Sequence, residues 1–195
     1  MPEFVALVFR FSLGYVFAIA GISKVSEGPG FARAVRNYEV LPQSLVAPVA
    51  RWLPRLELAG GLLLLMGVLQ SAVSSGLAVL LLGLMYGVGV NLVRGRRIDC
   101  GCFGSGGAAR ISWLTIARNL ILATMALLLA IYPSVTLAIP SPWESSPAGV
   151  VAPGDAVAVA MATISSVVIF QLVGAVARLS SVSGIIKTLV LSGRR

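Results

Sequence analysis

The sequence contains no histidine, only two cysteines and few charged residues, and each shortage excludes a class of protein or site. Without histidine, the chain lacks the commonest metal ligand and the usual acid–base group near neutral pH. Two cysteines form at most one disulfide, which excludes a scaffold stapled by several. Charged residues make up 11% of the 195 residues, against about 25% in soluble proteins. Such a chain has too little polar surface to cover itself in water, so we expect an integral membrane protein.

Hydrophobic residues make up 57% of the chain and gather in five apolar stretches. We expect membrane-spanning helices at 4–22, 56–69, 72–92, 113–132 and 156–177. A short amphipathic helix at 31–38 is expected on the membrane surface. Pro54 suits the first turn of the second span, and Ser112 suits the N-cap of the fourth. The expected fold class is therefore all-α, a polytopic membrane bundle with a four-helix core and a fifth C-terminal transmembrane helix.

The predicted organisation has three parts. Residues 1–132 form the four-helix membrane domain, residues 133–155 an exposed loop rich in proline, serine and glycine, and residues 156–195 the fifth helix and a basic tail. Gly83 and Gly87 have the spacing that lets two membrane helices approach closely. Arg10 lies inside the first span, and we expect its long side chain to reach outward to the membrane interface.

Most of the lysines and arginines behind the net charge of +8 lie outside the apolar spans, in segments between them and in the C-terminal tail. With five helices, these segments all fall on one side of the membrane, and the positive-inside rule places that side in the cytoplasm. We therefore expect a multi-pass protein of the cell membrane with its cysteine loop on the cytoplasmic side. No basic groove interleaved with aromatic residues is visible, so we expect no binding of nucleic acid.

The two cysteines lie in the glycine-rich loop Asp99-Cys100-Gly101-Cys102-Phe103-Gly104. Nearby positive charge favours the reactive thiolate, and four arginines flank this loop: Arg94, Arg96, Arg97 and Arg110. Gly101 relaxes the backbone enough for Cys100 and Cys102 to close a small disulfide, and a strained, exposed disulfide is labile. Redox chemistry at these two catalytic candidates is the leading interpretation. The alternatives are a purely structural pair and a Cu(I) site, since Cu(I) prefers soft ligands.

Ionisable and amide groups at similar depth form a candidate supporting set, since such groups in spans are functional candidates. Its members are Lys24, Glu57, Asn91, Arg94 and Arg118. Glu57 suits the dipole of a helix's first turn, or it is the buried partner of a cation. Arg118 can reach the interface or pair with Glu57. Apart from the Cu(I) alternative, the sequence indicates no metal site and no cofactor, and it has no residue signature for a quinone.

Several short motifs resemble one known family. They are Arg10, Gly21 and Lys24, then Asn37-Tyr38-Glu39-Val40-Leu41-Pro42, Leu53-Pro54-Arg55-Leu56-Glu57, Asn91-Leu92-Val93-Arg94-Gly95, the cysteine loop and Arg118-Asn119. Over residues 4–132 the chain resembles the MauE, or methylamine-utilisation, branch of the DoxX-like membrane proteins. The resemblance implies a four-helix bundle, thiol–disulfide chemistry, maturation of the exported methylamine dehydrogenase, and a thioredoxin-like partner.

Three hypotheses for function follow. The first is a membrane thiol–disulfide oxidoreductase or redox relay that exchanges electrons with another dithiol protein. The second is a non-catalytic assembly subunit that recruits a thioredoxin-like protein by its basic face, and the third is a Cu(I)-binding membrane protein. In each of them the lipid bilayer surrounds the helices.

Overall fold

The computed structural model describes residues 2–96, 98 and 111–134, together with Val157, Ala160, Met161, Thr163 and Ile164. These residues form five helices: α1 (Glu3–Glu27), α2 (Pro29–Asn37), α3 (Gln43–Met66), α4 (Gln70–Val93) and α5 (Trp113–Ile131). The described residues between 157 and 164 are also helical. The expected all-α fold is confirmed, and so is the short helix before the second long one.

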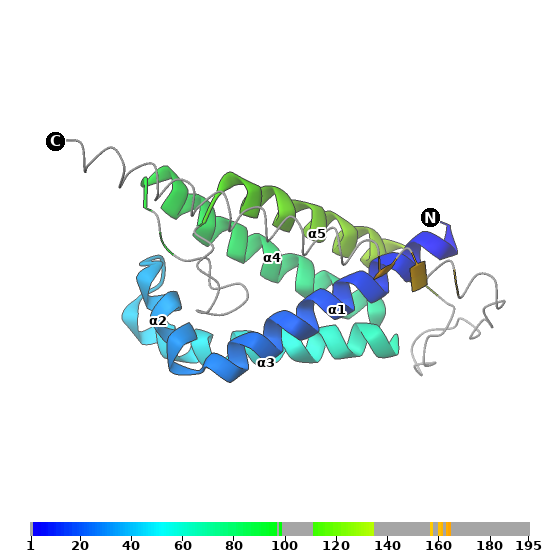
Figure 1. Ribbon diagram of the computed structural model, residues 1–195, viewed down its shortest axis with the longest axis horizontal. Coiled ribbons are helices and arrows are strands. Elements are labelled where there is room, and N and C mark those ends of the chain that lie inside the picture. Colours follow the sequence, from blue (N-terminus) through cyan, green and yellow to red (C-terminus); the bar gives the residue numbers. More distant parts are fainter. Residues whose placement is uncertain are drawn as a thin grey trace, which may run out of the picture.

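The four long helices run lengthwise, and each runs antiparallel to the next along the chain (Figure 1). Most contacts between helices join α1 to α3 and α4 to α5, with fewer from α3 to α4 and from α1 to α5. The short helix α2 lies at one end of the bundle. We call this the loop end, because Ile98 follows α4 there and Ile111 precedes α5. The turn from α3 to α4 and Ser134 lie at the opposite end.

Three of the described helices, α1, α4 and α5, are long and apolar enough to cross a membrane. The start of α3 differs from the expectation. It begins at Gln43, after the extended residue Pro42, and continues through Pro48 and Pro54. Each internal proline removes one backbone hydrogen bond, and packing of α3 against both α1 and α2 outweighs that loss. At α5 the expectation is confirmed, because the Ser112 side chain accepts a hydrogen bond from the helix.

The tightest helix packing is between α1 and α3, and glycine makes it possible. A Cβ atom on Gly61 would lie 2.5 Å from the backbone nitrogen of Ala18. The expectation for α4 is wrong: a Cβ on Gly83 would meet no atom of the described residues within 4 Å, and one on Gly87 would only touch the Tyr38 ring at 3.5 Å. Glycine spacing alone did not reveal which helix face has a close neighbour.

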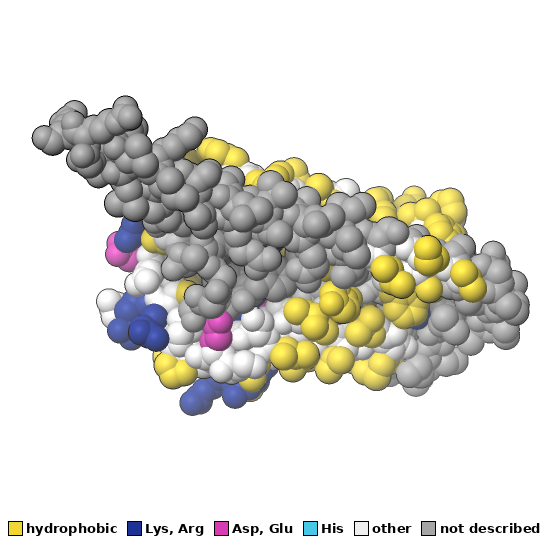
Figure 2. Space-filling model, in the orientation of Figure 1, with side chains coloured by type: hydrophobic (Ala, Val, Ile, Leu, Met, Phe, Trp, Pro, Cys, Tyr) yellow, Lys and Arg dark blue, Asp and Glu magenta, His cyan; other side chains and the backbone are white. Residues whose placement is uncertain are grey.

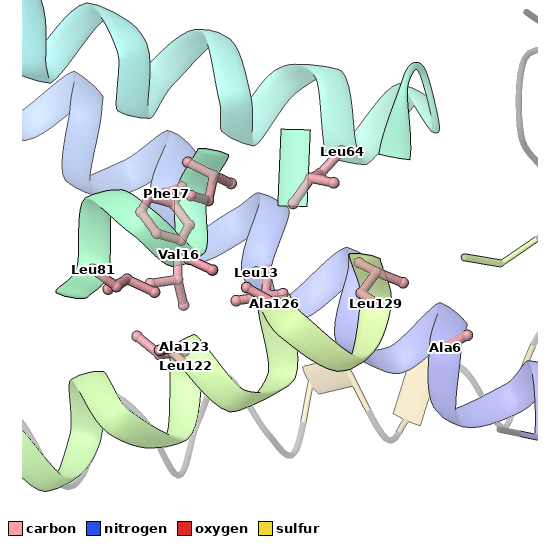
Figure 3. Packing of buried hydrophobic residues seen from close by; sticks show 12 residues of the cluster. Ala6, Leu13, Val16, Phe17, Leu64, Leu81, Leu122, Ala123, Ala126 and Leu129 are labelled. Carbon is pink, nitrogen blue, oxygen red and sulfur yellow. The ribbon is translucent and has the colours of Figure 1, made fainter. Parts of the chain in front are cut away.

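The hydrophobic core fills the space between the four long helices. Figure 3 shows its side chains converging from all of them, among them Leu13 and Phe17 of α1, Leu64 of α3, Leu81 of α4, and Ala126 and Leu129 of α5. The interior of this apolar chain is therefore packed along its length, and its buried polar side chains are concentrated toward the two ends.

The expectation for Arg10 is also wrong, because its side chain is only 1% exposed. Its Nη1 donates to Ser134 Oγ at 3.0 Å. Gln70 Nε2 donates to the Ser134 carbonyl at 2.7 Å, and Ser134 Oγ donates to Gln70 Oε1 at 2.8 Å. A buried guanidinium needs hydrogen-bond partners, and these residues supply one inside the bundle. The cluster joins α1, the start of α4 and the segment that follows α5 at the opposite end.

Candidate functional site

A buried ion pair lies at the loop end, between Lys24 of α1 and Glu57 of α3. The Lys24 Nζ donates to both carboxylate oxygens of Glu57, each at 2.6 Å. The two residues are 4% and 1% exposed. The pair forms because the helices nearly touch one turn away, where a Cβ on Gly21 would lie 2.6 Å from the Leu58 nitrogen. The Phe31 ring of α2 lies 5.6 Å from the Lys24 Nζ, where a ring face attracts a cation.

Arg118 of α5 is a further positively charged group in this region, and its charge acts on Lys24. Sequence analysis left two alternatives for Glu57, and the structure gives it a buried cation as partner. That partner is Lys24, whereas the sequence had offered Arg118. Lys24 and Arg118 are both expected at a depth similar to that of Glu57. The rotation of α1 about its axis makes Lys24 the partner.

A turn at Tyr38 and Glu39 connects α2 to the end of α4. Glu39 has a φ of +48°, in the left-handed region that non-glycine residues rarely adopt. The Asn91 Nδ2 donates to the Tyr38 carbonyl at 2.9 Å and to the Gly87 carbonyl at 3.0 Å. The Arg94 Nη1 approaches the Glu39 carbonyl at 3.4 Å. Two residues of the supporting set therefore hold this turn by its backbone.

The Glu39 side chain pairs with Arg96, the last described residue before Ile98. The Arg96 Nη2 donates to Glu39 Oε1 at 2.7 Å on the exposed surface. This hydrogen bond and the charge of Arg96 hold the pKa of the Glu39 carboxyl below its usual range, and Arg94 adds to the effect. Sequence analysis did not assign a role to Tyr38 or Glu39. The signal in the sequence is the motif around them, Asn37-Tyr38-Glu39-Val40-Leu41-Pro42.

The two residues that flank the cysteine loop, Ile98 and Ile111, lie side by side. The backbone nitrogen of Ile111 donates to the carbonyl of Ile98 at 2.9 Å, which closes the neck of this loop. Cys100 and Cys102 themselves lie outside the described residues. Of the seven predicted site residues, the structure therefore places five, all at the loop end.

A cavity of about 460 Å³ lies beside the ion pair, between α2, α3, α4 and α5. Lys24 and Tyr38 form part of its wall, and Asn119 of α5 contributes a buried amide. On the face shown in Figure 2, lysine and arginine side chains gather around this end, while apolar side chains cover much of the visible remainder. The loop end therefore combines buried charge, a cavity and a basic surface.

Known proteins resemble the part of the chain that contains the five helices. Residues 2–132 match the family model described as methylamine utilisation protein MauE. The chain belongs to the MauE family. A MauE protein of Paracoccus denitrificans is 35% identical over 144 residues, which are 73% of this chain and 76% of that protein. No solved structure matches the chain.

Two further MauE relatives show similar identity over shorter stretches. The protein of Paracoccus versutus is 39% identical over 60% of this chain and 64% of its own length. That of Methylophilus methylotrophus is 37% identical over 66% of this chain and 69% of its own length. The family match includes all seven predicted site residues and ends at the end of α5. With three apolar helices as well, this MauE chain is a membrane protein.

Proposed function

We propose that this MauE protein is a membrane thiol–disulfide redox protein that uses Cys100 and Cys102 to exchange electrons with a thioredoxin-like or other dithiol partner. Its relatives are named methylamine utilization proteins, and we propose the same physiological setting, maturation of methylamine dehydrogenase. One observation supports the proposal most directly. The only two cysteines lie in a loop whose neck is closed at Ile98 and Ile111, next to arginines that favour thiolates.

The exchange is a two-step substitution at sulfur. In one direction, the Cys102 thiolate attacks a partner disulfide, forms a mixed disulfide and expels one partner thiolate. The Cys100 thiolate then attacks the Cys102 sulfur, closes the Cys100–Cys102 disulfide and releases the second partner thiolate. In the reverse direction, a partner thiolate attacks Cys102 in that disulfide, and the partner leaves oxidised. Two electrons move in either direction.

Single serine variants test this mechanism. Cys100→Ser removes the resolving thiol and should trap a covalent complex with the partner that is released by reductant. Cys102→Ser should trap far less. The matched control is Ser105→Cys in the double serine background, which returns one thiol to the loop at a different position. If neither single variant traps a partner and the native pair is never found oxidised in cells, the redox proposal is wrong.

We also propose, from the distribution of charge, that the cysteine loop is on the cytoplasmic side. Labelling of thiols in intact cells with a membrane-impermeant maleimide tests this. Protection of the reduced cysteines until the cells are broken supports it, and labelling in intact cells places the loop outside.

A second candidate function is recruitment of a redox protein without chemistry by this chain. The observation that favours it is a set of exposed arginines on α2 and α3: Arg33, Arg36, Arg51 and Arg55. Such a surface suits an acidic protein face. The double variant Cys100→Ser/Cys102→Ser decides between the two, because full function without the thiols would favour recruitment alone.

A further inference from the structure

The cavity at the loop end has the size and lining of a ligand site. Its volume of about 460 Å³ is in the range of ~300–1,000 Å³ that is typical of pockets for small molecules and cofactors. Aromatic and aliphatic side chains form most of its wall, among them Phe31, Tyr38, Leu53 and Leu84. Such a wall binds an apolar body, while a few polar groups orient it.

One polar group in this wall forms no hydrogen bond with the described part of the chain. Asn119 is only 3% exposed and its side chain lines the cavity. Among residues 2–96, 98 and 111–134, none forms a hydrogen bond with its amide. An unsatisfied buried amide costs about 1–3 kcal/mol. A water molecule needs two to four polar partners, and the other buried polar residue of the wall, Lys24, already binds Glu57.

The cavity also reaches the exposed surface of the bundle. Gly83 and Tyr86 belong to its wall, and both are exposed on α4, one of the apolar candidate spans. The absence of a side chain at Gly83 leaves open space there within the described part of the chain. A ligand with a long apolar tail can therefore place its head inside while the tail remains in the bilayer.

We propose that this cavity binds the head group of a lipid-soluble quinone, with a ring carbonyl accepting a hydrogen bond from Asn119 Nδ2. The polar group that faces the cavity is the neutral amide of Asn119, and Glu57 neutralises Lys24, so a neutral head group fits better than a charged phospholipid head. A flat ring matches the aromatic wall at Phe31 and Tyr38. The choice of a quinone among neutral lipids rests on the proposed thiol–disulfide function, which requires a two-electron partner.

A quinone that accepts electrons sets the direction of electron flow, from the two thiols to the quinone. The two thiols of Cys100 and Cys102 lose two electrons and two protons as their S–S bond forms. The quinone takes up both electrons and both protons, and its two carbonyl groups become hydroxyl groups. The new disulfide then oxidises the dithiol of the protein partner. Tyr38 lies between the cavity and the end of α4, because it lines the cavity and Asn91 donates a hydrogen bond to its carbonyl.

The test is a binding measurement on the full chain in quinone-free lipid nanodiscs, with decylubiquinone as the probe. We expect saturable binding of about one probe per chain.

Two variants test the site. Gly83→Phe fills the open space in the wall, and Asn119→Leu removes the amide at nearly constant volume. Each should weaken binding by about tenfold or more. Gly76→Phe is the matched control for the first variant, because Gly76 is also open and on α4 but outside the wall. Thr124→Val on α5 is the control for the second.

Three results would overturn the proposal: no saturable binding to the wild type, unchanged binding by Asn119→Leu, or equal displacement of the probe by dioleoylglycerol, which would make the cavity a general lipid slot. Because Asn119→Leu introduces no bulk, it decides the outcome if Gly83→Phe fails to fold. The Cys100→Ser/Cys102→Ser variant should bind decylubiquinone as the wild type does. Retained quinone binding with no partner trapping would disprove the thiol function alone, and trapping without quinone binding would disprove this inference alone.

Discussion

The two ends of the bundle use buried polar residues in different ways. At the opposite end, Arg10, Gln70 and Ser134 meet in a set of hydrogen bonds of 2.7–3.2 Å that joins α1, α4 and the segment after α5. At the loop end, Lys24 and Glu57 form a buried ion pair beside a cavity. The first arrangement closes the bundle, whereas the second leaves space inside it.

This difference indicates where chemistry belongs in the molecule. A buried ion pair is often no more stable than apolar side chains of similar volume, so stability alone is a weak reason for Lys24 and Glu57. Charge beside an apolar cavity suits a functional site instead. The hydrogen-bonded cluster around Ser134 has an evident structural use, because it fixes the end of α5 against α1 and α4.

The largest expected effect comes from breaking the ion pair. Glu57→Leu leaves the Lys24 charge buried without its carboxylate and should destabilise the protein by about 3–5 kcal/mol. Far-UV circular dichroism during SDS-driven unfolding in mixed micelles measures this. The double variant Lys24→Met/Glu57→Leu should recover most of the loss, and Glu39→Gln, at an exposed acid, is the control. Equal loss in the single and double variants would show that the carboxylate does more than neutralise Lys24.

An intermediate effect is expected at the opposite end. Gln70→Leu removes the amide that binds Ser134 through both its backbone and its hydroxyl, and it should cost about 1–3 kcal/mol in the same assay. Decylubiquinone binding and partner trapping should not change. Ser75→Ala, which removes an exposed hydroxyl bonded within α4, is the control. Altered trapping in Gln70→Leu would mean that the two ends are coupled.

The smallest effect is expected at the exposed pair of Glu39 and Arg96. The pKa of Glu39 is lowered in the folded protein, so the pair stabilises the turn above the ordinary value of 4.5 and is lost as the pH falls through the lowered value. Arg96→Gln should return the Glu39 pKa toward its ordinary value, which NMR titration of the carboxyl carbon measures. Arg33→Gln should leave it unchanged. An unaltered Glu39 pKa in Arg96→Gln would contradict the hydrogen bond as its cause.

The sequence was sufficient for most of the fold, because long apolar runs and a good cap have local causes. The ranges of α1, α4 and α5 and the cap at Ser112 follow from hydropathy and from one side chain next to a helix start. The positions of Lys24, Glu57 and Asn91 within their apolar spans also predicted that all three lie at one end of the bundle. These quantities depend on position along the chain alone.

The remaining features depend on how each helix is rotated about its axis. That rotation makes Lys24 the partner of Glu57, turns Arg10 into the bundle toward Ser134, and leaves Gly83 beside a cavity. Apolar side chains surround several of these helices, so periodicity gives little information about which face is inside. The left-handed backbone at Glu39 had no local signal such as glycine.

The closed neck at Ile98 and Ile111 limits how far the cysteine loop can extend. Twelve residues separate these two positions, and a chain extends by at most about 3.3–3.6 Å per residue. With both ends fixed at one point, a chain of this length extends at most roughly 20 Å from the bundle, less than the ~30 Å thickness of the hydrocarbon core. We therefore expect the thiols to remain on one face of the membrane, so that a protein partner has to come to that face to meet them.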